Sequence, residues 1–153
     1  MTTEKQNTAE LPAQERLGQL EVTLQYMAEI SLAENQEQLD RGLRDLLGTI
    51  GEYTHAQRSF FFTYNPGAEC YRYSYEWCAD HTSSQQQNFY TVSVREMPQW
   101  HQRFTQGRDV IYEDIEDMKG PMPLEYEILR QQNVQAEISM PIFAGNQLWG
   151  FVG

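Results

Sequence analysis

The feature that most constrains the fold of this chain is a pair of aromatic-rich segments joined by a tight turn. Residues 58–64 and 70–78 both alternate in side-chain character with a period of two, and Asn65-Pro66-Gly67 between them is a strong turn signal. Two such runs joined by a short turn predict an antiparallel hairpin. Alternation along the second strand places its aromatic residues on one face, and these are Tyr71, Tyr73, Tyr75 and Trp77. The aromatic residues that share a face of the first strand are Phe60, Phe62 and Tyr64.

The region before the hairpin has a helical period instead. Residues 13–32 carry apolar side chains at three- and four-residue steps, which predicts a helix with one narrow apolar stripe. Because this stripe is closer to a coiled-coil seam than to a broad core face, we expect it to mediate a homodimer. The residues expected at the dimer contact are Leu17, Leu20, Leu24 and Met27. A second helix is predicted to begin after a cap at Asn35, with Gln38 at the capping-box position, and to weaken near Gly51.

Shorter elements are predicted after residue 78. They are a strand at 88–94, a helix at 97–106, a strand at 109–112, an acidic loop at 113–123, a helix at 124–132, a strand at 136–143 and the start of another strand at 147–153. This order lacks the regular strand–helix alternation of a parallel sheet. It predicts an α+β domain with a central antiparallel sheet flanked by helices. We expect one domain over residues 13–153, preceded by a polar, disordered leader over residues 1–12.

Net charge and hydropathy exclude several classes of partner. The chain carries 11 basic and 22 acidic residues, and its net charge of −11 repels nucleic-acid phosphates and anionic lipid headgroups. We therefore expect neither nucleic acid nor a membrane surface as a partner. No run of apolar residues is long enough to span a bilayer, and the polar N-terminus does not resemble a signal peptide, so we expect a cytoplasmic domain.

The sequence offers little catalytic or metal-binding chemistry. Cys70 and Cys78 would lie roughly 26 Å apart in one strand that rises ~3.3 Å per residue, so they cannot form a disulfide with each other. His55, His81 and His101 show no metal-ligand spacing, and the acidic loop lacks the ligand pattern of a calcium-binding loop. We therefore expect no metal, no cofactor and no enzymatic activity. A thiol-based small-molecule enzyme that uses Cys78 is the alternative.

The remaining aromatic and apolar residues are candidates for the walls of a small-molecule pocket. For each of them a filled core is the competing interpretation, and it is the favoured one for any single residue. The ligand-pocket candidates are Phe62, Tyr64, Tyr75, Trp77, Cys78, Tyr90, Trp100, Phe104, Tyr126, Leu129 and Met140.

Several short motifs follow one another in a specific order. They are Tyr75-Glu76-Trp77-Cys78-Ala79, Met97-Pro98-Gln99-Trp100, Arg108-Asp109-Val110-Ile111, Asp114-Ile115, the segment 127–134, Ser139-Met140-Pro141-Ile142 and the segment 148–153. Together they resemble the GAF domain family over roughly residues 17–153, most of all the bacterial branch found beside histidine kinase, PAS and diguanylate cyclase modules. The resemblance implies a mostly antiparallel sheet of five or six strands flanked by helices, a signal-input role and often a dimer. It also implies that the last strand continues past Gly153 into a helix, so we expect this end of the domain to be truncated.

Three subclasses of that family are disfavoured by the residues present. Cyclic-nucleotide-binding members carry an Asn-Lys pair, but neither Lys5 nor Lys119 follows an asparagine. Bilin-binding members usually attach the chromophore through a pocket cysteine, commonly beside a histidine, whereas Cys78 is separated from His81 and lies on a different element. Methionine-sulfoxide-reducing members use several loop cysteines, which this chain lacks. We therefore expect a signal-sensing or regulatory domain that binds an unidentified small molecule or mediates dimerisation, and so controls an output domain.

Overall fold

The computed structural model describes residues 12–153, so the predicted leader lies outside the described residues apart from Pro12. The helices are α1 (Ala13–Ser31), α2 (Gln36–Thr54), α3 (Pro98–Thr105), α4 (Pro123–Gln131) and the short 3-10 helix η1 (Ile115–Met118). The strands are β1 (Arg58–Asn65), β2 (Cys70–Cys78), β3 (Thr91–Ser93), β4 (Val110–Tyr112), β5 (Glu137–Ala144) and β6 (Gln147–Val152). The predicted order of helices and strands is confirmed, while the acidic loop contains η1.

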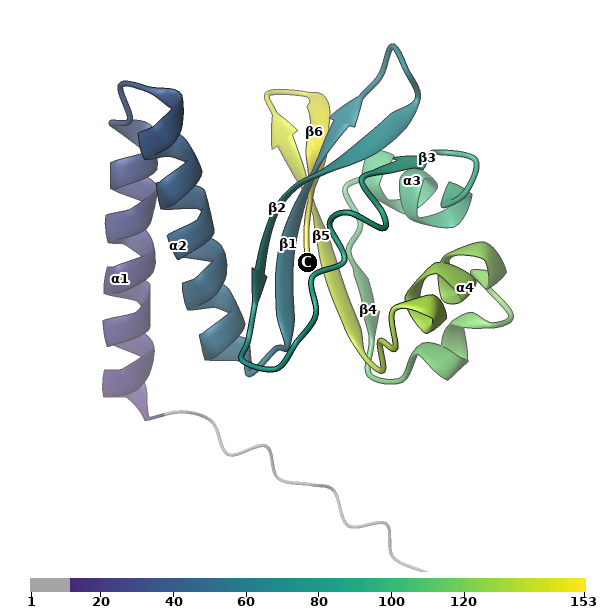
Figure 1. Cartoon of the computed structure of the whole chain (residues 1–153), viewed down its shortest axis with the longest axis horizontal. Coiled ribbons are helices and arrows are strands. Elements are labelled where there is room, and N and C mark those ends of the chain that lie inside the picture. The colour runs from purple at the N-terminus through teal and green to yellow at the C-terminus, as the bar shows by residue number, and fades with distance from the viewer. Residues whose placement is uncertain (1–11) are drawn as a thin grey trace, which may run out of the picture.

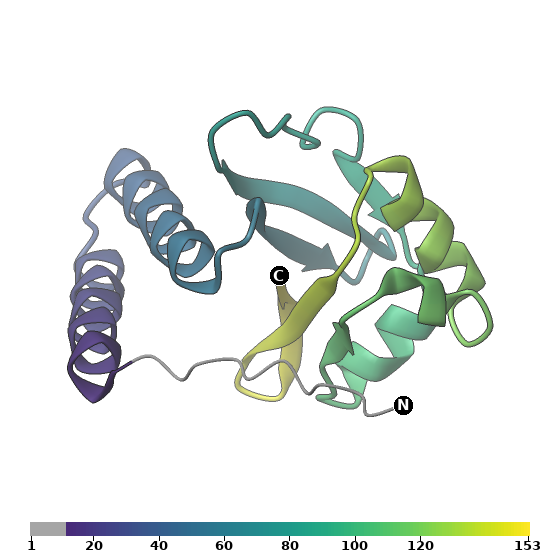
Figure 2. The same ribbon diagram turned by 90° about the horizontal axis from the view of Figure 1, so that it is seen from below.

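A curled antiparallel sheet forms the centre of the molecule. Its six strands have the order β3-β2-β1-β6-β5-β4, and every neighbouring pair is antiparallel. Helices α1 and α2 stand on one side of the sheet, and α3 and α4 lie on the other side (Figures 1 and 2). The predicted α+β class, with an antiparallel sheet flanked by helices, is therefore confirmed. None of the helices within residues 12–153 is long and apolar enough to cross a membrane.

Helix α2 is held directly against the sheet. It begins as the sequence predicts, because the Asn35 side chain accepts a hydrogen bond from the Gln38 N–H at 3.0 Å. Its glycines let the Trp77 indole of β2 approach the helix backbone: a Cβ at Gly48 would lie 3.1 Å from that ring, and one at Gly51 would overlap it. The position of Trp77 thus depends on two residues that have no side chain.

Helix α1 forms an outer layer against α2. Ile30 packs over Gly42 of α2, and Gln19, Thr23 and Tyr26 are the other half-buried residues of this contact face. The predicted dimer residues lie on a different face of α1 and are each more than half exposed: Leu17, Leu20, Leu24 and Met27. The apolar stripe is therefore not used for packing within the described part of the chain.

The second strand contains a β-bulge that the sequence analysis did not predict. Phe61 lies opposite Tyr75 and the next residue, Phe62, lies opposite Tyr73, so Ser74 is an extra residue in β2. An extra residue reverses the alternation of side chains beyond it. Tyr71 and Tyr73 therefore point toward α3 and α4, whereas Tyr75 and Trp77, which follow the bulge, point toward α2. The predicted single-faced ladder of four aromatics is wrong for this reason.

The main core lies between the sheet and the layer formed by α3, α4 and η1. Phe151 of β6 is at its centre, where it stacks on Phe62 with ring centroids 4.8 Å apart and on Phe104 of α3 at 4.7 Å. The face shared by Phe60, Phe62 and Tyr64 is confirmed, because Phe60 and Phe62 contact Tyr73 and Tyr64 contacts Tyr71. This side of the sheet is the one that borders the cavity described next.

Candidate functional site

A mostly apolar cavity lies between the sheet and helices α3 and α4. Its sheet wall is formed by Phe60, Phe62, Tyr73, Val92 and Phe151. The opposite wall comes from Met97, Trp100, Ile128, Leu129 and Val134, and Phe89 contributes from the segment before β3. The space inside is about 50 Å³. One ordered water needs roughly 10–15 Å³ by this measure, so the cavity has room for a few waters or for a correspondingly small ligand.

One polar corner of the cavity joins β1, α4 and β5. The Arg58 guanidinium donates to the Gln132 carbonyl oxygen at 3.0 Å, which ties the start of β1 to the end of α4. Glu137 lies nearby, buried at the start of β5, and accepts a hydrogen bond from the Ser139 hydroxyl. Burial raises the pKa of Glu137 from 4.5 to about 7, although Ser139 and Arg58 act in the opposite direction. This carboxyl therefore changes charge near neutral pH.

A second buried carboxylate links the two helices that cover the cavity. Glu125 of α4 accepts hydrogen bonds from the N–H groups of Gln99 and Trp100 at 2.6 and 3.1 Å. These are among the first N–H groups of α3, which have no partner inside their own helix. Glu125 therefore caps α3 from a different helix, and its charge is balanced in part by the positive end of the α3 dipole.

Two atoms in the same wall are left without a hydrogen bond. The second carboxylate oxygen of Glu125, Oε2, and the indole Nε1 of Trp100 are both buried and have no hydrogen-bond partner among residues 12–153. Glu125 is 2% exposed and Trp100 is 6% exposed. A buried polar group without a partner costs about 1–3 kcal/mol. Both residues line the cavity, while these two atoms themselves are enclosed by the surrounding residues.

A third carboxylate anchors the segment that carries Phe89. Glu76 accepts from the Tyr73 hydroxyl at 2.9 Å, from the Gln85 N–H at 3.0 Å and from the Ser84 hydroxyl. The Gln86 side-chain amide donates to the carbonyl oxygens of Tyr73 and Ser74, at 3.2 and 3.1 Å, next to the β-bulge. The segment between β2 and β3 is therefore fixed to the sheet at the point where the strand is irregular.

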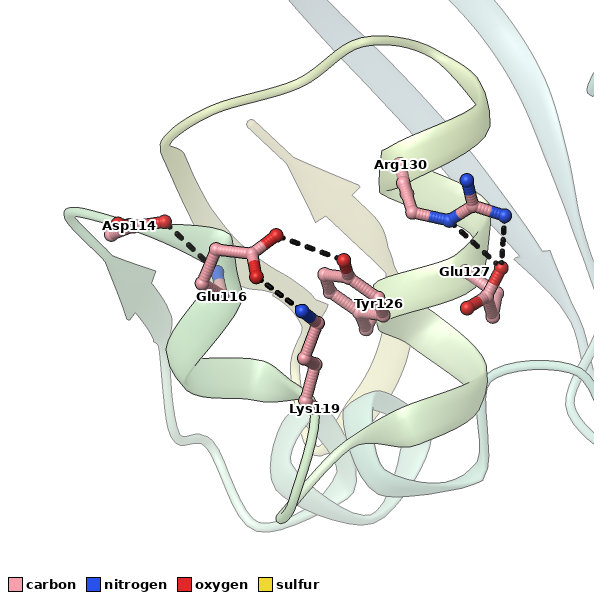
Figure 3. A network of polar contacts seen from close by, with 6 residues as sticks. All are labelled: Asp114, Glu116, Lys119, Tyr126, Glu127 and Arg130. Atoms are coloured by element: carbon pink, nitrogen blue, oxygen red, sulfur yellow. Dashed lines mark hydrogen bonds and ion pairs between the residues drawn. The ribbon is translucent and has the colours of Figure 1, made fainter.

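A polar network on the surface holds α4 in place (Figure 3). Glu116 of η1 accepts from the Tyr126 hydroxyl at 2.9 Å and forms an ion pair with Lys119. These contacts, Lys119 first, lower the pKa of Glu116. Arg130 pairs with Glu127 along α4 at 2.8 Å. Exposed ion pairs contribute little individually. The Tyr126–Glu116 hydrogen bond joins η1 to the helix that carries Glu125 and Leu129.

The structure brings together only part of the predicted pocket set. Phe62, Trp100 and Leu129 line the cavity. Three more belong to the surrounding core without reaching the cavity, namely Tyr64, Phe104 and Tyr126.

The other predicted pocket residues lie away from this cavity. Tyr75 and Trp77 follow the β-bulge and face α2, where the Tyr75 hydroxyl donates to Asp40 at 2.7 Å. Met140 pairs with Val152 on the α2 side of the sheet and is exposed, and Tyr90 is exposed beneath the Arg72 guanidinium.

Cys78 ends β2 and is half-buried, outside the cavity wall. Burial, followed by the charge of Glu76, raises the pKa of its thiol. A nucleophilic cysteine needs the opposite shift. No cluster of three potential metal ligands occurs in the part of the chain that the structure describes.

Sequence reasoning missed the polar residues of the cavity. The sequence around Glu137 does alternate, with Glu137 and Ser139 on one face of the strand and Ile138 and Met140 on the other. Such a pattern ordinarily assigns the apolar pair to the core and the polar pair to the solvent. The structure has the reverse arrangement, with Glu137 and Ser139 buried and the apolar pair exposed. Glu125 gave no local signal, because the helix that it caps precedes it in the chain.

Comparison with known proteins gives one family. The model of the GAF domain family matches residues 38–153. No curated protein matches the chain.

Similar solved structures include chromophore-binding domains. The phycoerythrobilin-bound GAF domain of a cyanobacterial phytochrome has a TM-score of 0.70 and 14% identity, over 90% of this chain and 80% of that one. A red/green cyanobacteriochrome in its red-light-absorbing state has a TM-score of 0.60 and 23% identity, over 72% of this chain and 71% of that one. The chromophore-binding domain of the Stigmatella aurantiaca bacteriophytochrome has a TM-score of 0.65 and 14% identity, over 89% of this chain and 50% of that one. At these identities the likeness concerns the fold.

Proposed function

Because the chain belongs to the GAF domain family, we propose that it is a sensory or regulatory domain that binds a small molecule in the cavity between the sheet and helices α3 and α4. The observation that carries this proposal is the mostly apolar cavity, which has a polar corner formed by Arg58, Gln132 and Glu137. Ligand sites are typically apolar with a few polar groups that fix orientation.

The ligand that we propose is smaller than a bilin. Two of the solved neighbours named above are a phycoerythrobilin-bound GAF domain and a chromophore-binding domain. Here the space is about 50 Å³, which is well below the roughly 300–1,000 Å³ of pockets for drug-sized ligands. Cys78, which was predicted to line the pocket, lies outside the cavity wall. The raised thiol pKa of Cys78 also argues against the thiol-enzyme alternative.

The signal would leave the domain on the opposite side of the sheet. Helix α2 packs on β1 and β2 behind the cavity, and Ser59 of β1 donates to the Leu47 carbonyl oxygen of α2 at 2.5 Å. A ligand that favours one of two packings of α2 and α1 changes their populations by its differential affinity for them. We propose that such a shift controls an output domain, such as a histidine kinase or a diguanylate cyclase, in a cytoplasmic bacterial signalling protein.

We also propose that the domain forms a homodimer through α1. The support is the apolar stripe formed by Leu17, Leu20, Leu24 and Met27, which is exposed although its spacing is that of a helix–helix seam. Such a contact would place two copies of α1 side by side and would join the outer layers of two domains.

The cavity proposal is tested by native mass spectrometry of the purified chain and of two variants of α4. We expect a bound small molecule in the wild type and its loss in Leu129→Trp, which fills the cavity from a buried position. Leu124→Trp is the matched control, because Leu124 lies on the same helix but is exposed. Circular dichroism verifies that both variants fold. Retention of the molecule by Leu129→Trp would place the site elsewhere and contradict the proposal.

A further inference from the structure

We infer that the ligand of this cavity is a short-chain monocarboxylate, whose carboxylate lies in the polar corner between Arg58 and Glu137. The inference rests on the proposed function, because it names the chemical class that the same cavity takes. Its basis is a guanidinium without a carboxylate partner and a buried carboxyl group with one free oxygen, and both residues line the cavity. The alkyl chain of the ligand lies against the apolar walls.

Arg58 supplies the positive charge of this corner. Its guanidinium donates to the main-chain oxygen of Gln132 at 3.0 Å and to the side-chain oxygen of that residue at 3.5 Å, and both acceptors are neutral. Among residues 12–153, no carboxylate pairs with this guanidinium, because each ion pair there involves another cation. A guanidinium has several N–H donors in one plane, so donors remain for the two oxygens of a ligand carboxylate.

Glu137 supplies a polar atom that borders the cavity. The residue is 7% exposed, and one of its oxygens, Oε1, accepts from the Ser139 hydroxyl. The enclosed side-chain atoms without a hydrogen-bond partner among residues 12–153 are Gln19 Oε1, Trp100 Nε1 and Glu125 Oε2. The second oxygen of Glu137, Oε2, has no such partner within these residues either, yet it is not one of the enclosed atoms. It therefore keeps accessible surface, and the cavity is the space that Glu137 lines.

The charges at this corner suit an anionic head group when Glu137 is protonated. Burial raises the pKa of Glu137 to about 7, so near neutral pH a large share of the molecules carry a proton there that can be donated to a ligand oxygen. The corner then has the charge of Arg58 alone. Glu125, the other acidic residue of the wall, is engaged by the N–H groups of α3, and its remaining oxygen is enclosed.

The groups on the neighbouring strands do not alter this balance. Tyr112 lies opposite Glu137 in β4 and adds a hydroxyl group rather than a charge. Cys78 lies opposite Arg58 in β2, and burial raises the pKa of its thiol, which keeps it uncharged near neutral pH. The charge that acts on Glu137 is that of Arg58.

The size of the cavity selects a short chain. A space of about 50 Å³ holds roughly three to five water-sized groups, which matches the non-hydrogen atoms of acetate, propionate or butyrate. Such a molecule fits without movement of Phe89, whose segment is fixed to the sheet by Glu76 and Gln86. Arg58 and Gln132 are half-buried, so the polar corner can be reached from solvent.

The test titrates butyrate, butyramide and butylamine into the full chain at pH 6 and at pH 8 by ligand-detected NMR. These probes share a short alkyl chain and differ in the charge of the head group. A simple carboxylate is ionised at both pH values, whereas Glu137 changes from mostly protonated to mostly ionised between them. We expect butyrate to bind about tenfold more tightly at pH 6 than at pH 8. We expect butyramide and butylamine to bind more weakly than butyrate at pH 6.

Two variants assign the effect to the polar corner. Glu137→Gln keeps an N–H donor that does not titrate, so it should bind butyrate at pH 8 as tightly as the wild type does at pH 6. Arg58→Gln removes the positive charge and should weaken butyrate binding roughly tenfold or more at pH 6. The matched controls are Glu127→Gln and Arg72→Gln, at exposed positions, and they should keep the wild-type affinities. If Arg58→Gln does not fold, Glu137→Gln still provides the test.

Several results would overturn the inference and separate it from the proposed function. Equal binding of butyrate at both pH values, preferred binding of butyramide or butylamine at pH 6, or an unchanged pH dependence in Glu137→Gln would refute the monocarboxylate class and leave the cavity as a ligand site. Retention of butyrate by Leu129→Trp would place the butyrate site outside the cavity. Binding of none of the three probes would refute the short-chain class, and a co-purified molecule that Leu129→Trp loses would in that case still support the proposed function.

Discussion

Glu137 is the residue whose ionisation the fold changes in the most consequential way. Burial at the start of β5 raises the pKa of the Glu137 carboxyl from its ordinary value of 4.5 to about 7. The folded state therefore binds more protons than the unfolded state between these two pH values. The stabilisation is fully present below pH 4.5 and is lost as pH rises through about 7.

We predict that thermal stability falls between about pH 5 and pH 8 and that Glu137→Gln reduces this dependence. The gap between the two pKa values corresponds to on the order of 3 kcal/mol of unfolding free energy. Glu137→Gln keeps the volume and an acceptor for Ser139, so it should raise stability at pH 8 relative to the wild type and have little effect at pH 5. Thermal and denaturant unfolding of the wild type and of Glu137→Gln at several pH values measures these differences in stability. Parallel curves for the variant and the wild type would contradict the assignment of the dependence to Glu137, and Glu127→Gln on the surface of α4 is the control.

At the scale of elements, the contact between α2 and β2 depends on glycines. Gly48 and Gly51 face the Trp77 indole, which the β-bulge turns toward this helix. In an exposed helix, glycine is less favourable than alanine by roughly 0.5–1 kcal/mol. Packing against Trp77 is therefore the physical reason for glycine at these positions of α2.

We predict opposite effects for two Gly→Ala substitutions in neighbouring helices. Gly51→Ala places a methyl group within the Trp77 ring and should destabilise the fold by about 1–3 kcal/mol. Gly18→Ala, in α1, meets no atom within 4 Å and should stabilise by up to about 1 kcal/mol. Urea unfolding followed by circular dichroism measures both changes. An unchanged free energy of unfolding in Gly51→Ala would mean that Trp77 does not lie against Gly51.

At the scale of the whole molecule, the domain is layered: α1, then α2, the sheet, and finally α3 with α4 (Figure 1). The proposed ligand cavity and the proposed dimer stripe lie on opposite sides of the sheet. Communication between them would pass through the strands. Both β1 and β2 reach the two sides, and β2 contributes Tyr73 to the cavity and Trp77 to the contact with α2. The β-bulge at Ser74 therefore lies between Tyr73, which lines the cavity, and Trp77, which contacts α2.

We predict a dimer in solution that depends on the apolar stripe of α1. Leu20→Glu combined with Leu24→Glu should convert it to a monomer without changing the helix content, because both side chains are exposed in the folded chain. Size-exclusion chromatography with light scattering at micromolar concentrations measures the mass. Gln14→Glu, elsewhere on α1, is the control for added charge, and a monomeric wild type would refute the proposed contact.

The sequence by itself determined the elements of the fold. The apolar period of 3.6 marked α1 and α2, the period of two marked the hairpin, and Asn35 was found as the cap of α2, because each of these signals depends on residues within a few positions of one another. The order of short motifs identified the family for the same reason. Phe62, Trp100 and Leu129 could be selected as wall candidates from their type and position in these elements.

Only the tertiary structure decided which side chains meet. One extra residue in β2, Ser74, places Tyr75 and Trp77 on the other face of the sheet. No local sequence pattern predicts this bulge. The role of Glu125 depends on the start of a helix that is 25 residues earlier in the chain, and the pKa of Glu137 depends on burial. Periodicity records the neighbours of a residue along the chain, whereas the cavity is made by residues from 58 to 151 that become neighbours only when the sheet closes against α3 and α4.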